Sequence, residues 1–377
     1  MEKDKNDKEL FMQEEKKKEE KDKQKETKTE KKYIPGIGID VGTANVCSCR
    51  RKEDGTFDVK SHRNMLFEME LNEFSDDLLE RGDYVYIKSG KKCYIVGADA
   101  LSLVNAIGKG TIIRPMANGL LNVELKTSQE LLNKILEAVV GKPICENEPL
   151  RFSVPASNVV NKPGVNNLFH QMVLKEFFNS LGFISQPINE ALANLYNESP
   201  SMKLDNGEEY PLTGYSISFG GGMVNSAIVL KGMSLIEFCS TSAGDQIDQN
   251  VSLATGEPTS KIIVVKEKKL NLDKIDQNDR IQVGLGIYYS EMISRIFKQI
   301  SKEFSKDSRE FEGAVDVVIC GGTAMAPGFI NRVKEVVKNI ELPFRVGEIR
   351  LSSNPFFSVS QGCCLRGLSD YSKMNKK

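Results

Sequence analysis

A chain of 377 residues is longer than one hydrophobic core usually supports, so the sequence predicts two lobes or domains. The formal net charge of −1 gives no global attraction to nucleic acid or anionic lipid, and we expect no nucleic-acid partner. No apolar run approaches the length that spans a bilayer, and the charged N-terminus lacks the apolar core of a signal peptide. We therefore expect a cytoplasmic protein without direct membrane insertion.

Eight cysteines are present but no CxxC pair, and His62 and His170 are the only histidines that could join them as ligands. This pattern predicts reduced, buried thiols rather than disulfides or a zinc site.

Residues 1–32 are rich in Lys and Glu and have almost nothing to bury apart from Leu10, Phe11 and Met12. We expect a solvated, disordered tail whose deletion leaves thermal stability nearly unchanged. The alternative is a docking arm or a regulator of self-association.

From Lys32 onward the composition becomes that of a folded domain. A strand meander is expected, with a hairpin turn at Asp54-Gly55, over Ile37–Val41, Val46–Arg50 and Phe57–His62. A second hairpin is expected over Tyr84–Ile87 and Cys93–Val96. The acidic segment between them, Asn64–Arg81, reads as irregular and receives no function.

Two helices and a strand follow. Capping-box spacing at Thr127–Glu130 predicts the start of a core-packing helix. Arg151–Val154 is expected to be a strand. A long amphipathic helix ending at Gly182 is then marked by Val165, Leu168, Phe169, Met172, Phe177 and Leu181. His170 lies in this helix, where we expect a structural role. Glu190 belongs to a short predicted helix, Asn189–Tyr196.

The second half repeats the pattern of the first. Strand Tyr215–Phe219, the turn Gly220-Gly221-Gly222 and strand Ala227–Leu230 have the order of the opening element, which suggests a duplicated lobe. Further helices are expected at Asp245–Ala254, Ser260–Lys269 and Ile287–Phe304. Strand Val315–Ile319 leads into Cys320-Gly321-Gly322-Thr323, and helices are expected after Gly328 and over Phe357–Leu368.

The first glycine turn, in Ile37–Thr43, can approach a phosphate group. Gly42 has no Cβ to keep a phosphate from the backbone N–H groups, and Thr43 adds a hydroxyl donor. Asp40 is placed to hold a hydrated Mg²⁺. Taken alone, such a strand and turn are common, but two further glycine clusters follow strands at Gly220–Gly222 and Gly321-Gly322.

Three glycine turns in this order resemble the nucleotide-binding set of actins, heat-shock chaperone ATPases and sugar kinases. The resemblance runs from about Pro35 to Leu368 and is especially actin-like over Gly321–Gly328. Tyr94–Ala100 and Arg114–Gly119 are similar to segments of bacterial actins of the MreB and MamK type. The resemblance implies an α/β fold of two lobes, each a mixed sheet flanked by helices, with ATP or ADP and Mg²⁺ between them.

The resemblance to this family also implies domain bounds and site residues. The bounds are a tail at 1–32, lobe I at 33–187, lobe II at 188–352 and a C-terminal helix at 353–377 returning to lobe I. Asp40 would hold the metal, and Asp40 and Glu190 would serve catalysis, with Glu190 orienting the attacking water. Nucleotide contacts would come from Gly42, Thr43, Ala44, Gly220, Gly221, Gly222, Lys266, Glu267, Gly321, Gly322, Thr323 and Met325. Gly244-Asp245 resembles a turn near the ribose.

The second loop departs from the family pattern. Ser218 stands where the family has an Asp, Met223 and Val224 replace two threonines, and Asn225 replaces a second Asp. The backbone of the three glycines can still cradle phosphate, so we expect binding with slow hydrolysis, since losing one catalytic electrostatic group commonly costs ~10²–10³-fold in rate.

Three functions follow from the resemblance. The first is an actin-like cytoskeletal protein that binds ATP and polymerises. The second is a degenerate, non-polymerising scaffold or adaptor, which the altered second loop favours. A sugar kinase is third, because no sugar-binding Asp or large insertion can be identified.

Overall fold

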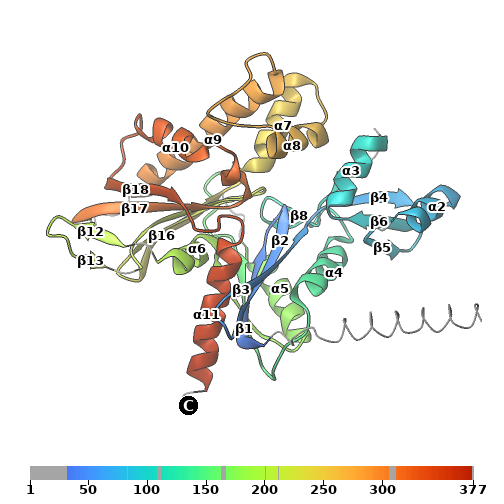
Figure 1. Cartoon of the computed structure of the whole chain (residues 1–377), viewed down its shortest axis with the longest axis horizontal. Coiled ribbons are helices and arrows are strands. Elements are labelled where there is room, and N and C mark those ends of the chain that lie inside the picture. Colours follow the sequence, from blue (N-terminus) through green and yellow to red (C-terminus); the bar gives the residue numbers. More distant parts are fainter. Residues whose placement is uncertain are drawn as a thin grey trace, which may run out of the picture.

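The computed structural model describes residues 32–82, 84–107, 112–162, 167–199, 201–210, 212–304 and 311–375. The predicted tail, apart from Lys32, lies outside the described residues. Within them, two mixed sheets with helices around them form the body of the molecule (Figure 1).

The first sheet has the strand order β11-β10-β1-β2-β3. Its strands are β1 (Tyr33–Val41), β2 (Asn45–Lys52), β3 (Phe57–Arg63), β10 (Pro149–Val154) and β11 (Ile184–Asn189). β1 pairs in parallel with β10 and antiparallel with β2. The predicted meander is therefore confirmed, and Gly55 takes the positive φ of 84° that its turn requires.

The second sheet repeats this arrangement. β14 (Gly214–Phe219) pairs in parallel with β17 (Gly313–Cys320) and antiparallel with β15 (Val224–Leu230), which pairs with β16 (Met233–Ser240). β17 also pairs with β18 (Arg345–Leu351) and with β12 (Met202–Leu204), and β12 pairs with β13 (Glu209–Tyr210). In each sheet a parallel partner flanks the first strand of an antiparallel meander, so the predicted duplication is confirmed.

A smaller sheet extends from the first one. It contains β4 (Leu66–Glu70), β5 (Tyr86–Ser89), β6 (Lys92–Val96) and β7 (Ile112–Ile113), with β8 (Met116–Ala117) and β9 (Leu120–Leu121) forming a separate hairpin. Helices α2 (Glu73–Arg81) and α3 (Ala98–Ile107) lie with the smaller sheet in Figure 1.

The prediction that Asn64–Arg81 is irregular was wrong, because this segment contains β4 and α2. Leu66 and Phe67 of β4 are buried. The Asn72 side chain accepts a hydrogen bond from the Ser75 N–H at 3.0 Å, and Ser75 Oγ accepts one from the Asn72 N–H at 2.8 Å. This reciprocal cap starts α2. Ser75 stands where the capping-box pattern usually has Glu or Gln, so the sequence pattern does not indicate the cap.

The other helices of the described residues are α4 (Ser128–Val140), α5 (Leu168–Ser180), α6 (Glu190–Glu198), α7 (Gly244–Thr255), α8 (Thr259–Lys268), α9 (Arg280–Phe304), α10 (Phe329–Val337) and α11 (Ser358–Met374), with a short 3₁₀ helix η1 (Gly322–Met325). Helix α4 starts where predicted, but the capping box does not form, since Thr127 makes no side-chain capping hydrogen bond.

The apolar residues predicted to mark α5 pack inward only in part: Phe177 and Leu181 lie against the core, and Val165 is outside the described residues. Leu168, Phe169 and Met172 are 60%, 57% and 53% exposed. The buried residues of the helix are His170, Val173, Leu174 and Phe178. Both sets have helical spacing, so periodicity alone could not choose the face that packs on the sheet. His170 is buried, and its Nδ1 accepts a hydrogen bond from the Leu121 N–H at 3.2 Å, which supports the structural role.

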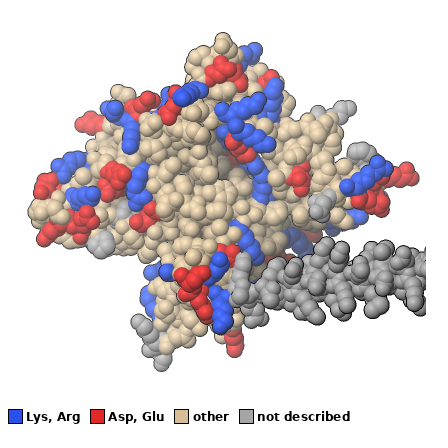
Figure 2. All heavy atoms as spheres, viewed as in Figure 1, with Lys and Arg blue, Asp and Glu red and all other residues tan. Residues whose placement is uncertain are grey.

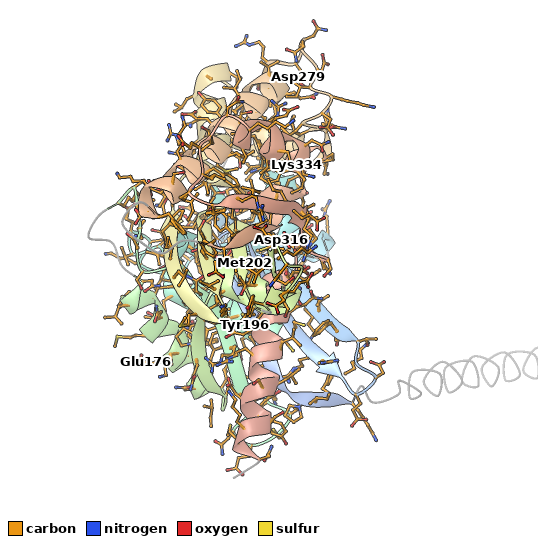
Figure 3. All side chains as sticks on the ribbon, turned by 90° about the vertical axis from the view of Figure 1, so that its left-hand side faces the viewer. Glu176, Tyr196, Met202, Asp279, Asp316 and Lys334 are labelled. Atoms are coloured by element: carbon orange, nitrogen blue, oxygen red, sulfur yellow. The ribbon has the colours of Figure 1, made fainter. Side chains whose placement is uncertain are left out.

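Each large sheet has its own hydrophobic core. Helix α11 joins the two parts of the chain by packing on β1 and α6. A Cβ on Gly38 would lie 2.1 Å from Cys364 N, and one on Gly362 would lie 1.8 Å from Ala193 O, so these glycines allow the backbones to touch. Tyr196 of α6 lies beside α11 in Figure 3, with the Arg366 guanidinium 5.3 Å from its ring centroid.

Basic and acidic side chains are interspersed on the face shown in Figure 2. Within the described residues, no helix is both long and apolar enough to cross a membrane.

Candidate functional site

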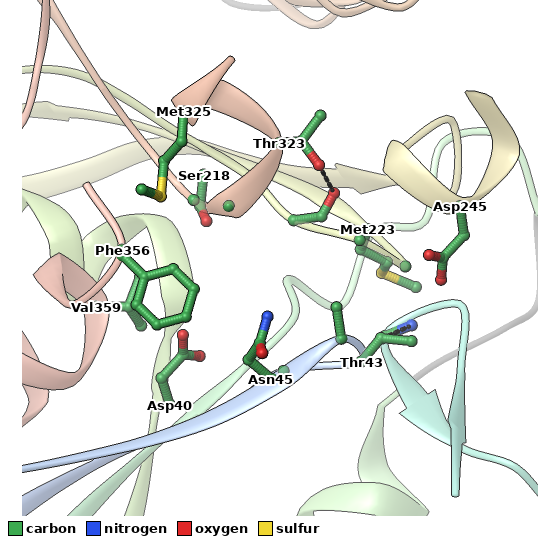
Figure 4. Close-up of a pocket in the computed structure, with 18 of the residues that line it drawn as sticks. Asp40, Thr43, Asn45, Ser218, Met223, Asp245, Thr323, Met325, Phe356 and Val359 are labelled. Carbon is green, nitrogen blue, oxygen red and sulfur yellow. Dashed lines mark hydrogen bonds between the residues drawn. The ribbon is translucent and has the colours of Figure 1, made fainter. Parts of the chain in front are cut away.

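The three glycine turns meet around one cavity of about 410 Å³ between the two large sheets (Figure 4). This volume is in the usual range for small-molecule sites. Every site residue predicted from the sequence lines it: Asp40, Gly42, Thr43, Ala44, Glu190, Gly220, Gly221, Gly222, Lys266, Glu267, Gly321, Gly322, Thr323 and Met325. The fold therefore brings the whole predicted set together, although their roles stay predictions.

The first turn is held by short backbone and side-chain bonds. The Gly42 N–H donates to Asn45 O at 3.1 Å, and a Cβ on Gly42 would lie 2.5 Å from that oxygen. Glycine is thus required here by the turn itself. Thr43 Oγ1 accepts a hydrogen bond from the Gly119 N–H at 3.0 Å, a bond that leaves the hydroxyl proton available to donate.

Asp40 stands at the end of β1 and faces the cavity (Figure 4). Ser153 Oγ donates to its Oδ1 at 2.7 Å. Burial raises the pKa of Asp40 to about 6, and the Ser153 hydrogen bond opposes that shift. A cation beside Asp40 would favour its ionised form.

The second turn touches the first. A Cβ on Gly222 would lie 2.3 Å from Thr43 Oγ1, and one on Gly221 would lie 2.9 Å from Ala44 Cβ. Gly220 O accepts hydrogen bonds from Thr323 Oγ1 at 2.8 Å and from the Gly244 N–H at 3.2 Å. Only glycine lets these backbones come so close, and the contacts tie all three turns to one another.

The third turn leaves open space for a ligand. Gly321 has a φ of 97°, and its Cβ would lie 2.4 Å from Phe219 O, so the backbone there also needs glycine. By contrast, a Cβ on Gly322 would meet nothing within 4 Å although Gly322 lines the cavity.

Glu190, the first residue of α6, lines the cavity. Its Oε1 accepts from Ser218 Oγ at 2.5 Å and its Oε2 from Asn225 Nδ2 at 2.7 Å. Burial, and then the negative charge of Asp40, raise the pKa of Glu190 to about 8, while the two hydrogen bonds oppose this. The side chain of Asn189 caps α6 by accepting from the Leu192 N–H at 3.2 Å, which fixes where Glu190 begins the helix.

Lys266 and Glu267 of α8 already have ion-pair partners. Lys266 Nζ lies 2.6 Å from Asp248 Oδ2. Burial raises the pKa of Asp248 to about 6, and Lys266 opposes the shift. Glu267 makes a two-pronged ion pair with Arg63, in which Nη1 and Oε2 are 2.9 Å apart.

Sequence reasoning missed Arg63, Asp248 and Ser153 as site residues. Arg114 opens a segment that carried the family resemblance, and its partner is Asp245 of the Gly244-Asp245 turn, at 2.7 Å. These pairings join residues far apart in the chain, and no local pattern indicates them.

Two sheets with repeated topology, enclosing a cavity where three glycine turns meet, define the class of two-lobed actin-like folds. The sequence profile of the volactin family matches residues 36–366, so the chain belongs to the volactin family. No curated protein has significant sequence similarity to it.

Three solved structures have a similar fold. A MamK double helical filament has a TM-score of 0.62 at 16% identity, covering 89% of this chain and 98% of MamK. MreB5 of Spiroplasma citri bound to ADP has a TM-score of 0.56 at 15% identity, covering 91% and 97%. The ethanolamine utilization protein EutJ from Carboxydothermus hydrogenoformans has a TM-score of 0.52 at 12% identity, covering 88% and 89%. The predicted fold is confirmed.

Proposed function

We propose that this chain binds ATP or ADP with Mg²⁺ in the cavity between its lobes and assembles into filaments, with slow ATP hydrolysis. The observation that carries the proposal is the meeting of three glycine turns, from both sheets, around one cavity. The similar MamK structure is a double helical filament, and the similar MreB5 structure is bound to ADP.

The residues have distinct roles in this proposal. The backbones of Gly42–Ala44 and Gly220–Gly222 cradle the phosphates, while Gly321–Met325 and α8 hold the adenosine. Because Lys266 and Glu267 are paired with Asp248 and Arg63, they contact the nucleotide beside those partners or in competition with them.

Asp40 is the residue proposed for the metal. Mg²⁺ usually keeps several waters and takes one or two carboxylates plus phosphate oxygens, so one carboxylate at this position is sufficient. When bound, Mg²⁺ would neutralise phosphate charge. Glu190 would orient the attacking water.

The proposal includes the domain bounds 33–187 and 188–352, with residues 353–377 returning to lobe I. In support, the core of the first sheet draws its residues from Ile37 to Phe183, and that of the second from Tyr215 to Ile349. We also propose a cytoplasmic, cytoskeletal location and self-association as the main partnership, with the tail as a second contact.

A non-polymerising scaffold is the second candidate. It is favoured by the replacements at Ser218, Met223, Val224 and Asn225, which remove two carboxylates and two hydroxyls from the second loop. The two functions differ in whether nucleotide binding leads to assembly.

The test is electron microscopy of negatively stained, purified protein with Mg·ATP, with Mg·ADP and without nucleotide, together with equilibrium binding of Mg·ATP. Filaments with Mg·ATP support the cytoskeletal function. Monomers in every condition, with binding intact, support the scaffold. Failure to bind contradicts both.

Variants of Gly322 give a graded control, because a Cβ added there would meet nothing within 4 Å. Gly322→Ala is expected to bind Mg·ATP nearly as well as wild type. Gly322→Leu places a branched side chain at the cavity wall and is expected to lose binding and assembly while keeping its melting temperature. Equal binding by both variants would count against the proposed cavity.

A further inference from the structure

The two replaced carboxylate positions of the second loop both contact Glu190. Ser218 and Asn225 are direct cross-strand partners on β14 and β15, and both are fully buried. Ser218 Oγ donates to one carboxyl oxygen at 2.5 Å, and Asn225 Nδ2 donates to the other at 2.7 Å. Partners directly opposite on antiparallel strands hold their side chains about 5 Å apart, a spacing that lets them bracket one carboxyl group.

The orientation of the Asn225 amide is fixed by a third bond. The Ala156 N–H donates to Asn225 Oδ1 at 3.1 Å. This bond turns the NH₂ group toward Glu190 and leaves no other arrangement in which both neighbours are satisfied.

A carboxylate at position 225 would lose this arrangement. One oxygen of Asp could still accept from Ala156, but the other would then face Glu190 Oε2, which now lies 2.7 Å from Asn225 Nδ2. Two carboxyl groups that close in a buried site cannot both ionise, and Asp at 225 has no amide N–H to donate to Glu190 Oε2. The same argument applies to Asp at position 218, because the Ser218 hydroxyl that now donates to Glu190 Oε1 would be lost.

We propose that Ser218 and Asn225 are positioning residues that hold the Glu190 carboxyl in one orientation toward the cavity. The replacements at Ser218 and Asn225 then serve the function of Glu190, and they do not mark a loop that has lost its catalytic role. This inference rests on the proposed function, namely ATP turnover in this cavity.

The proposal makes a prediction opposite to that of decay. If the loop had decayed, restoring the family carboxylates would raise ATP turnover. If Ser218 and Asn225 position Glu190, restoring the family carboxylates at these positions lowers ATP turnover. Misplacing a reacting group by about 1 Å can cost ~10²-fold in rate, so a fall of 10-fold to 100-fold in kcat is expected.

The experiment measures phosphate release from Mg·ATP and equilibrium binding of Mg·ATP for the full chain. Asn225→Asp is nearly isosteric and is expected to lower kcat by at least ~10-fold while changing Kd less than ~3-fold. Ser218→Ala is expected to lower kcat in the same way, and Ser218→Thr, which keeps the hydroxyl, is expected to restore it.

Ser226→Ala is the matched control. Ser226 is equally buried on β15 but follows Asn225 and so points to the opposite face, toward Tyr215. Its kcat should equal that of wild type.

Turnover in Asn225→Asp or Ser218→Ala that matches or exceeds wild type overturns the positioning role. So does wild-type protein that binds Mg·ATP but releases no phosphate. Absence of Mg·ATP binding in wild type is a different result, because it removes the proposed function as well.

Discussion

Arg114 and Asp245 join the two lobes at the wall of the cavity. Arg114 Nη1 lies 2.7 Å from Oδ1 and 2.8 Å from Oδ2 of Asp245, and the two side chains are only 18% and 25% exposed. The Asp245 N–H also donates to Gly221 O at 2.8 Å, so the ion pair is tied to the second glycine turn. A second ion pair, between Arg63 and Glu267 of α8, also lines the cavity.

This pair is expected to contribute to stability. A double-mutant cycle of Arg114→Gln and Asp245→Asn should give a coupling of about 1 kcal/mol in the free energy of unfolding, because the pair is mostly shielded from water. The control is the cycle of Lys134→Gln and Glu137→Gln, an exposed pair at 3.9 Å within α4, where a coupling near zero is expected. A coupling as small as that of the control would show that the ion pair between Arg114 and Asp245 does not stabilise the fold.

The two phenylalanines of α5 test which face of the helix is buried. Phe178 is fully buried and packs on Phe152 with ring centroids 5.3 Å apart, whereas Phe169 is 57% exposed. Phe178→Ala is expected to cost about 3–5 kcal/mol in the free energy of unfolding. Phe169→Ala should change it by no more than about 0.5 kcal/mol. Chemical denaturation measures both, and similar losses would contradict the assigned face.

The glycine turns could be predicted because the lack of space for a Cβ is a local requirement, and a glycine in the sequence shows it directly. Gly42, Gly222 and Gly321 each stand where a Cβ would overlap another atom, and a glycine after a predicted strand is a readable signal. The repeated strand, turn and strand order likewise indicated the two related sheets before their pairing was known.

The ion pairs around the cavity could not be predicted in this way. Arg63 and Glu267 are 204 residues apart, and Arg114 and Asp245 are 131 apart. A charged side chain has the same local pattern whether it faces water or a partner in the other lobe. The buried face of α5 was predicted only in part for a related reason. Two apolar stripes on the helix have the same spacing, and only contact with the sheet decides which of them is buried.

Stability without nucleotide or metal should fall as the pH rises from 6.5 to 8. The pKa of Glu190 is raised from 4.5 to about 8, and that of Asp40 from 3.8 to about 6. The folded protein therefore keeps protons that the unfolded chain has lost, so the stabilisation is full below the unfolded pKa values and disappears as pH passes the folded ones. Denaturation at several pH values measures this slope.

Glu190→Gln should flatten that slope, while Glu137→Gln, which removes an exposed carboxylate of α4, should leave it unchanged. A wild-type profile that is level from pH 6.5 to 8 would contradict the raised pKa of Glu190.

Buried His170 should act in the opposite direction at lower pH. Burial lowers its pKa from 6.5 to about 4, so the unfolded chain takes up the proton first and stability is lost as the pH falls through this range. His170→Gln is expected to flatten the acid side of the profile relative to wild type, even if its absolute stability is lower. An unchanged slope between pH 6 and 4 in the variant would assign acid unfolding to other groups.

Asp40→Ala and Glu190→Ala are expected to abolish ATP turnover while leaving the fold intact. Glu190→Ala leaves the buried Ser218 and Asn225 donors without their acceptor, so a lower melting temperature is expected although the protein stays folded. Their effects on binding should differ. Asp40→Ala should weaken binding of ATP in the presence of Mg²⁺ but not in its absence, since Asp40 acts through the metal, whereas Glu190→Ala should leave both affinities unchanged. Equilibrium binding and phosphate release measured on the same samples separate these outcomes, and unchanged phosphate release in both variants would rule out the assignment.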